Sequence, residues 1–548
     1  MILVGRGTLA PVSRAVFRCL VVTCVAAGLL AGGGDPAGAR QIHLVLRPDF
    51  SWSMPARFGL DDDADGLIDL PNDAAYVRAA GPCGLSCDEA LFSVRFDASS
   101  SVAELDGNPL TPHYHRWKLG DEAGRVRQYV TRAPTLVVRL PEGRYRVEMS
   151  MTVPLPSGQA TARAVRDVAV EDLLIVAIGD SYAAGDGNPE RHRLETGGEP
   201  AWADGLGLSD TDHAAAHRTS LAWPAQAALW LERSDPASSV TFASLAASGA
   251  TVARGLLGPQ NGSLPEAQVA RVAALAGERT IDALLVSIGG NDVGFGDLIR
   301  GLVDADPLLD PICYRTDLAN VWASVTDGNW NRGSRLRWSI TNPFVIGCRS
   351  VPITGRPIVA GLAGLGAELD RLAAAIEEQL GEVPVYLMEY PDPTGHQRDG
   401  ADELCRAIVD DAAPFGFHEI NRSEQQDGLD RVLRPLNRAL EEAAIRHGWT
   451  YVGGVADAFA AGHGYCAPWP AYGSGGRDLG DPSGWYRNPG ATGLQLQPGH
   501  SLVSWYRTAA QSAALQGGSR FETGGTLHPN ELGQQAMAQR MLAVLRGD

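Results

Sequence analysis

The feature that most constrains the fold is one apolar run, residues 173–178, which ends in Gly179, Asp180 and Ser181. An uninterrupted apolar run of this length, closed by a turn, predicts a strand buried on both faces, as in a parallel sheet. The turn leaves Ser181 at the carboxyl end of the strand, where open α/β sheets form their ligand crevice. A serine there acts as a nucleophile only if a base removes its proton and hydrogen-bond donors receive the oxyanion. Alone, the same residues suit a helix N-terminus equally well.

Three later stretches supply such groups. Gly249 follows a predicted strand at 241–245 and offers an unhindered backbone N–H. Asn291 follows a second predicted strand at 281–288, and its amide is a side-chain donor. His528 stands just before the last predicted helix and can serve as a base. Each of the three therefore lies next to a strand end or in a loop.

Ser, Gly, Asn and His in this order resemble the four sequence blocks of the SGNH (GDSL-type) hydrolases. The similarity extends to residues 218–224 and 294–295, which is typical of the secreted esterase and lipase branch. It covers residues 173–548 and implies an α/β hydrolase domain with a flavodoxin-like parallel sheet and flanking helices.

The resemblance also implies a role for each residue. Ser181 would attack an ester carbonyl, and His528 would accept its proton and return it to the leaving alcohol. The oxyanion would be bound by the backbone N–H groups of Ser181 and Gly249 and by the amide of Asn291. No cofactor is implied for this chemistry.

One position departs from the family pattern. The family usually has an aspartate three residues before the histidine, and here that position is Gly525. Either the Gly525 carbonyl orients the imidazole of His528, or another acid such as Glu522 replaces the aspartate. A Ser–His dyad occurs in the branch that this chain resembles, so we expect the centre to be active.

Beyond Ser181, strand patterns alternate with helical spacing, which predicts a parallel sheet with helices on both faces. Helices are expected at 221–233, 265–275, 361–380, 429–447 and 530–545, and further strands at 384–389 and 450–452. Three long insertions, at 295–354, 391–427 and 463–525, interrupt this order. The last contains Trp469, Tyr472, Trp485 and Trp505, which suit either an acyl or glycan pocket or packing within the insertion.

Residues 91–172 have a different pattern, with short alternating strands separated by turn residues. The stretches 96–100, 117–121 and 143–147 resemble polycystic-kidney-disease (PKD) type immunoglobulin-like modules. The resemblance implies a small all-β sandwich, which is more often a spacer or binding accessory than a catalyst. Because almost no linker separates it from residue 173, we expect it to pack directly on the hydrolase domain.

Residues 1–39 are typical of a secretory signal peptide, with three arginines, an apolar run at 19–31 and small residues before position 40. The run is shorter than the roughly 20 residues of a membrane-spanning helix, and no later run is long enough. Removing residues 1–39, which hold three arginines and one aspartate, changes the net charge from −18 to −20. We therefore expect a secreted, acidic and monomeric protein that binds neither nucleic acid nor anionic membranes.

Six cysteines remain outside the signal segment, and an even number in an exported chain indicates disulfides. Proximity in the sequence favours three pairs without excluding other pairings. These are Cys83–Cys87, Cys313–Cys348 and Cys405–Cys466.

Within residues 40–90, alternating aspartates followed by Gly66 match the frame of a Ca²⁺-binding loop. Asn72 occupies the place of the usual bidentate glutamate, so a solvated acidic loop remains the alternative. The expected ligands of this structural Ca²⁺ site are Asp61, Asp63, Asp65 and Asp69.

The sequence therefore favours a secreted serine hydrolase that cleaves lipid or small acyl esters. An acyl esterase or acyltransferase acting on polysaccharide would use the same Ser–His machinery. A non-catalytic surface binding protein on a hydrolase scaffold is the alternative from another class, and the missing aspartate would suit it.

Overall fold

The fold is described from a computed structural model. It describes residues 43–56, 91–156, 158–190, 202, 215–260, 264–277, 279–294, 358–398, 401–404, 407–408, 420–421, 425–426, 428–465, 467, 485–486, 495–496, 504–507, 512, 515–516 and 524–547. The expected signal peptide, the aspartate-rich loop, the six cysteines of the expected disulfides and the 295–354 insertion lie outside these residues.

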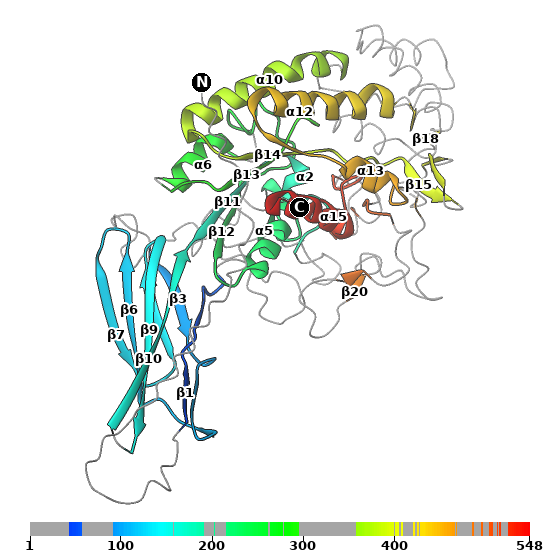
Figure 1. Ribbon diagram of the computed structural model, residues 1–548. Helices are drawn as coiled ribbons and strands as arrows, with labels where there is room; N and C mark the ends of the chain where they lie inside the picture. The colour runs from blue at the N-terminus through cyan, green and yellow to red at the C-terminus, as the bar shows by residue number, and fades with distance from the viewer. Residues whose placement is uncertain are drawn as a thin grey trace, which may run out of the picture.

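A five-stranded parallel sheet forms the centre of the larger domain (Figure 1). Its order is β12 (Ser239–Ser244), β11 (Asp172–Gly179), β13 (Ala283–Ser287), β14 (Val385–Met388) and β19 (Thr450–Val452). Every residue of β11 is buried, which explains its continuous apolar sequence. The strand order is that of flavodoxin-like folds, so the predicted α/β class is confirmed.

Helices cover both faces of this sheet (Figure 1). On one face α5 (Trp223–Ser234) packs against α15 (Glu531–Arg546). On the other, α10 (Ile358–Leu380) contacts both α6 (Gln268–Ala276) and α12 (Arg434–His447). The remaining described elements of this domain are α2 (Ser181–Ala184), β15 (Gly395–Arg398), β16 (Ala401–Leu404), β17 (Ala407–Ile408), β18 (Ile420–Asn421), η3 (Leu429–Leu433), α13 (Val455–Ala460), β20 (Trp485–Tyr486) and β21 (Gln495–Leu496).

The N-terminal module consists of antiparallel sheets around a core of its own. The sheets are β10 (Gly158–Val170), β9 (Gly143–Leu155), β6 (Tyr114–Asp121) and β7 (Val126–Thr131); β2 (Ser51–Ser53), β3 (Phe92–Asp97) and β8 (Thr135–Leu140); and β1 (Leu44–Arg47), β4 (Val102–Leu105) and β5 (Asn108–Pro109). In strands such as β3 buried residues alternate with less buried ones, because one face of each sheet is packed on the core. The predicted small all-β sandwich is therefore present.

The boundary of this module differs from the sequence interpretation, which placed residues 40–90 in a separate segment. β2 pairs with β3, and β1 pairs with β4, so residues 44–53 complete two of the sheets. Phe50 packs against Trp117 with ring centroids 5.7 Å apart, in the middle of the core. The sequence pattern does not predict β1 and β2, because each has only three or four residues, too few to show the alternation of a strand.

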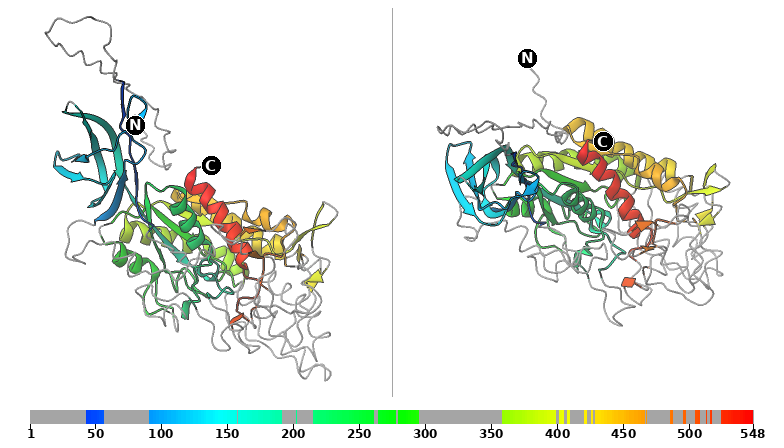
Figure 2. Two further views of the ribbon diagram at one scale, coloured as in Figure 1. Left: turned by 90° about the horizontal axis from the view of Figure 1, so that it is seen from below. Right: turned by 60° about the horizontal axis from the view of Figure 1, so that its bottom comes forward.

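The two domains lie next to each other at a short junction (Figure 2). Hydrogen bonds join them there. The carboxylate of Glu142 in the module accepts the backbone N–H of Asp172 at 2.8 Å. Asp172 in turn accepts a hydrogen bond from Arg279 at 2.7 Å. The backbone N–H of Met54 donates to the carbonyl of Pro236 at 2.9 Å. The module therefore packs directly on the α/β domain.

Candidate active site

Ser181 is held at the end of β11 by a turn that requires glycine. Gly179 has φ +146°, and a Cβ added there would lie 2.2 Å from the carbonyl oxygen of Ser287. Asp180 is the N-cap of α2 and accepts the backbone N–H of Tyr182 at 3.1 Å. Ser181 is the first residue of this short helix, so its own N–H has no intrahelical partner. The turn thus presents at the sheet edge both a hydroxyl and an N–H that has no intrahelical partner.

His528 meets this serine from the other end of the chain. Its Nε2 lies 2.7 Å from Ser181 Oγ, and its Nδ1 lies 3.2 Å from the carbonyl oxygen of Thr526. A carbonyl can only accept a hydrogen bond, so Nδ1 carries the proton and Nε2 is the acceptor that faces the hydroxyl. Burial lowers the pKa of His528, which favours the neutral imidazole. The ring is therefore placed to act as a general base for Ser181, with its proton on Nδ1 and its lone pair on Nε2.

The hydrogen bond from the ring goes to the carbonyl of Thr526. The carbonyl of Gly525 accepts the backbone N–H of His528 at 3.1 Å and, like that of Thr526, raises the pKa of the ring. A Cβ added to Gly525 would lie 2.5 Å from both Gly187 Cα and Gln516 Oε1. No aspartate fits at this position unless the backbone moves. Glu522, the other acid considered, lies outside the described residues.

Gly249 and Asn291 come from the loops after β12 and β13, which flank β11. Gly249 has φ +80°, a conformation that favours glycine. The Asn291 amide donates to the carbonyl of Ala250 at 2.9 Å, which uses one of its two N–H bonds. Asp292 accepts the backbone N–H of Val252 at 3.1 Å. The Asn-Asp pair therefore fixes the loop that carries Gly249.

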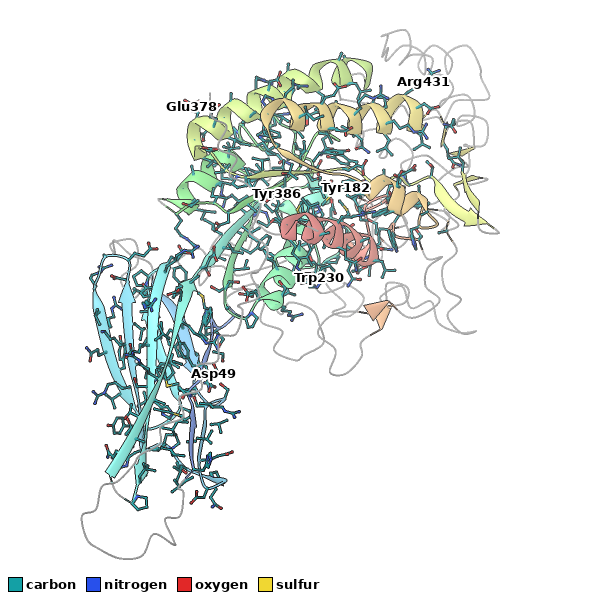
Figure 3. All side chains as sticks on the ribbon, viewed as in Figure 1. Asp49, Tyr182, Trp230, Glu378, Tyr386 and Arg431 are labelled. Atoms are coloured by element: carbon teal, nitrogen blue, oxygen red, sulfur yellow. The ribbon has the colours of Figure 1, made fainter. Side chains whose placement is uncertain are left out.

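Behind the serine lies a buried layer of tyrosines. Figure 3 shows Tyr182 in the interior, between the layer of α10 and α12 and the helix α15. The hydroxyl of Tyr390 donates to Asp180 and accepts the backbone N–H of Gly290 at 2.9 Å. Burial raises the pKa of Asp180 to about 7, and the hydrogen bond from Tyr390 opposes this rise. These contacts connect the turn before Ser181 to the loop before Asn291.

Sequence reasoning missed Asp186, which stands two residues after α2 in a Gly-Asp-Gly stretch. Its buried carboxylate accepts hydrogen bonds from Ser248 Oγ at 2.6 Å and Gln516 Nε2 at 2.6 Å. It also lies 3.1 Å from His217 Nδ1. Burial by itself would raise the pKa of Asp186, but the charge and hydrogen bond of His217 hold it below its usual range. In the sequence, only the two flanking glycines, Gly185 and Gly187, indicate that Asp186 lies in a tight turn beside the nucleophile.

The remaining expectations have mixed outcomes. Trp505 packs against Phe459 and stacks on His463 with centroids 3.6 Å apart, whereas Trp469 and Tyr472 lie outside the described residues. Within the described residues no group of three or more His, Cys, Asp or Glu side chains is arranged to hold a metal ion. The Ca²⁺ site at Asp61, Asp63, Asp65 and Asp69 stays a prediction.

In the part of the chain that the structure describes, no helix has both the length and the apolar sequence needed to cross a membrane. Neither a protein-family model nor a curated protein matches the sequence.

The solved structures that show some similarity include two lipases and an esterase. The extracellular lipase of Streptomyces rimosus is 17% identical with a TM-score of 0.33, over 68% of this chain and 99% of the lipase. Phospholipase A1 of Streptomyces albidoflavus NA297 is 19% identical with a TM-score of 0.33, over 68% and 98%. The acetyl xylan esterase Est2A of Butyrivibrio proteoclasticus is 9% identical with a TM-score of 0.21, over 74% and 89%.

Proposed function

We propose that this chain is a secreted serine esterase that hydrolyses carboxylic esters. The observation that carries the proposal is the hydrogen-bonded series Ser181 Oγ, His528 Nε2, His528 Nδ1 and Thr526 carbonyl. A nucleophile, a base of the correct tautomer and a group that orients the base are the parts needed for acyl transfer.

In the first half-reaction Ser181 Oγ attacks the ester carbonyl while its proton moves to His528 Nε2. The tetrahedral oxyanion collapses, and the imidazolium returns the proton to the leaving alkoxide, which departs as the alcohol. Water then attacks the acyl-serine and gives a proton to Nε2. The second tetrahedral intermediate releases the carboxylic acid, and the proton returns to Ser181 Oγ.

Three donors are suited to bind the oxyanion: the N–H of Ser181, the N–H of Gly249 and the second N–H of the Asn291 amide. The first is unpaired within its helix, and the hydrogen bond from Asn291 to Ala250 holds the third in place. Loss of one such donor in a well-studied protease costs about 10²–10³ in rate.

Two finer statements belong to the same proposal. The substrate is a lipid ester or a small acyl ester, and an acyl ester on a polysaccharide is the alternative. We assign the N-terminal sandwich an accessory role as a PKD or immunoglobulin-like module, because its residues form a core separate from that of the α/β domain. A purely binding protein is disfavoured by the 2.7 Å contact between Ser181 and His528, which binding alone does not require.

The proposal is tested by labelling of the serine with an active-site probe and by hydrolysis of a model ester. The parent should react with a fluorophosphonate probe and hydrolyse p-nitrophenyl butyrate, and Ser181→Ala should do neither. Ser150→Ala, on β9 of the N-terminal module, is the matched control and should behave as the parent. Hydrolysis by Ser181→Ala at the parent rate, or a folded parent that neither labels nor turns over, would refute the proposal.

A further inference from the structure

The Asp186 carboxylate lies at the junction of three chain segments that carry the proposed centre. Its own backbone N–H donates to the carbonyl of Ser181 at 3.0 Å, so it is anchored to the helix of the nucleophile. One carboxylate oxygen accepts Ser248 Oγ at 2.6 Å, and Ser248 immediately precedes Gly249. The other accepts Gln516 Nε2 at 2.6 Å.

Gln516 passes this contact on to the histidine loop. Its Oε1 accepts the backbone N–H of Gly525 at 3.0 Å, while the carbonyl of Gly525 accepts the backbone N–H of His528 at 3.1 Å. Asp186 is therefore connected to His528 through the side chain of Gln516 and the backbone of Gly525.

The segment that carries Asp186 also fills the space that an acid at position 525 would need. Gly187 Cα is one of the atoms 2.5 Å from a Cβ built on Gly525. The next residue, Asn188, donates to the carbonyl of Pro529 at 2.9 Å and accepts from Arg507 at 2.6 Å. The turn after the nucleophile helix is thus bonded to the residues on both sides of His528.

We propose that Asp186 is a positioning residue that replaces the aspartate absent from position 525. It holds the His528 loop through Gln516, and its negative charge raises the pKa of His528. The imidazole of His217, when protonated, partly offsets this negative charge. This inference rests on the proposed function, since it assigns a role in the same centre.

The charges around the imidazole determine what Asp186 does to it. The negative charge of Asp186 raises the pKa of His528, whereas burial and the charge of His217 lower it. The Tyr182 ring lies 5.0 Å from the imidazole, and burial raises the pKa of its hydroxyl, so it stays neutral. Arg507 is paired with Glu531 at 2.5 Å and adds little net charge. Asp186 is thus the nearby anion that stabilises the imidazolium formed during attack.

The test compares two substitutions that alter charge in opposite directions. Asp186→Asn keeps the shape of the side chain and removes the anion. His217→Asn removes an imidazole that carries positive charge when it is protonated; the His217 side chain is 38% exposed, and its φ of 54° is one that asparagine tolerates. The pH profile of kcat/KM for p-nitrophenyl butyrate reports the pKa of His528 on its acid limb.

We expect Asp186→Asn to lower kcat by about 10–10²-fold, less than the ~10⁴-fold seen when an acid in direct contact is neutralised. Its acid limb should move to lower pH by about one unit, because an anion has been removed from the vicinity of the imidazolium. The acid limb of His217→Asn should move to higher pH. A residue that is merely structural would lower kcat and thermal stability without opposite shifts of the two limbs.

A second readout does not need turnover. The pKa of His528 can be followed by NMR titration of labelled histidine in a Ser181→Ala background, with His528→Gln to identify its signal. The same opposite shifts are expected there, so the inference remains testable even if the proposed esterase activity fails. Unchanged His528 pKa values, or shifts in the same direction, would overturn it. If Asp186→Asn does not fold, His217→Asn still tests the proposed balance of charges around His528, and the absence of an upward shift there would overturn the proposal.

Discussion

The hydroxyl of Tyr182 donates to the carbonyl of Leu527 at 3.0 Å, so the residue after the proposed nucleophile holds the residue before the proposed base. Leu527 has φ +58°, a conformation that costs free energy for a residue with a branched side chain. The backbone N–H of Leu527 is held by the carbonyl of Arg507 at 3.0 Å. The position of His528 thus depends on hydrogen bonds that compensate a strained neighbour.

Tyr182→Phe should weaken this arrangement. It removes the donor from a buried carbonyl, and a buried acceptor left without its partner costs about 1–3 kcal/mol of unfolding free energy. We expect a lower thermal midpoint and a several-fold lower kcat, with KM nearly unchanged. Calorimetry and steady-state kinetics provide the measurement, and Tyr129→Phe on β7 is the control. Equal melting curves for parent and Tyr182→Phe would show that this hydrogen bond contributes no stability.

Gly525→Ala should be much more damaging than Gly524→Ala. The added Cβ at 525 would lie 2.5 Å from Gly187 Cα, whereas the one at 524 has its nearest atom, Asp186 Oδ2, at 3.8 Å. Overpacking of this kind typically costs about 1–3 kcal/mol. Chemical denaturation of the two variants measures the difference.

For the same reason Gly525→Asp should fail to rebuild a triad, and its turnover should be lower than that of the parent. A Gly525→Asp variant that is both stable and faster than the parent would show that the backbone at Gly187 can move to make room for the aspartate.

Asn291→Ala should lower kcat by about 10²–10³ with little change in KM, the scale of losing one oxyanion donor. Asp292→Asn tests the neighbouring loop contact, because asparagine retains an oxygen that can accept the N–H of Val252. We expect kcat of Asp292→Asn to decrease only a few-fold. Single-turnover kinetics on p-nitrophenyl butyrate measure the loss of rate in each of the two variants. Equal losses in both variants would mean that Asn291 acts by holding the loop at Ala250 and not by binding the oxyanion.

Asp180 should make stability depend on pH. Its folded-state pKa of about 7 exceeds the ordinary value of 3.8, so the folded state holds an extra proton between these two values. Stability from this group is therefore greatest at low pH and decreases as the pH rises toward 7. Asp180→Asn keeps the N-cap but removes the titration.

Thermal midpoints of the parent and Asp180→Asn, measured from pH 5 to pH 8, check this prediction. As the pH rises, the thermal midpoint of Asp180→Asn should increase relative to that of the parent. Asp167→Asn, on an exposed position of β10, is the control and should follow the parent throughout. A constant offset between Asp180→Asn and the parent would mean that Asp180 does not titrate in this range.

Much of the fold follows from local pattern. The apolar run before Gly179 has no polar interruption, which predicts a strand buried on both faces, and β11 lies inside the sheet between β12 and β13. The order of Ser181, Gly249, Asn291 and His528 predicts that they meet, because parallel strands end at one edge. The 2.7 Å contact across 347 residues agrees with that expectation.

Only the tertiary structure decided what surrounds the histidine. The choice of Thr526 as the partner of Nδ1 depends on the path of one loop, and that path depends on the space that Gly187 occupies beside Gly525. Asp186 and Gln516 are 330 positions apart, and no periodicity within either segment encodes their hydrogen bond. Sequence patterns report which face of an element is buried, whereas the neighbours of a buried charge are selected by how distant segments pack.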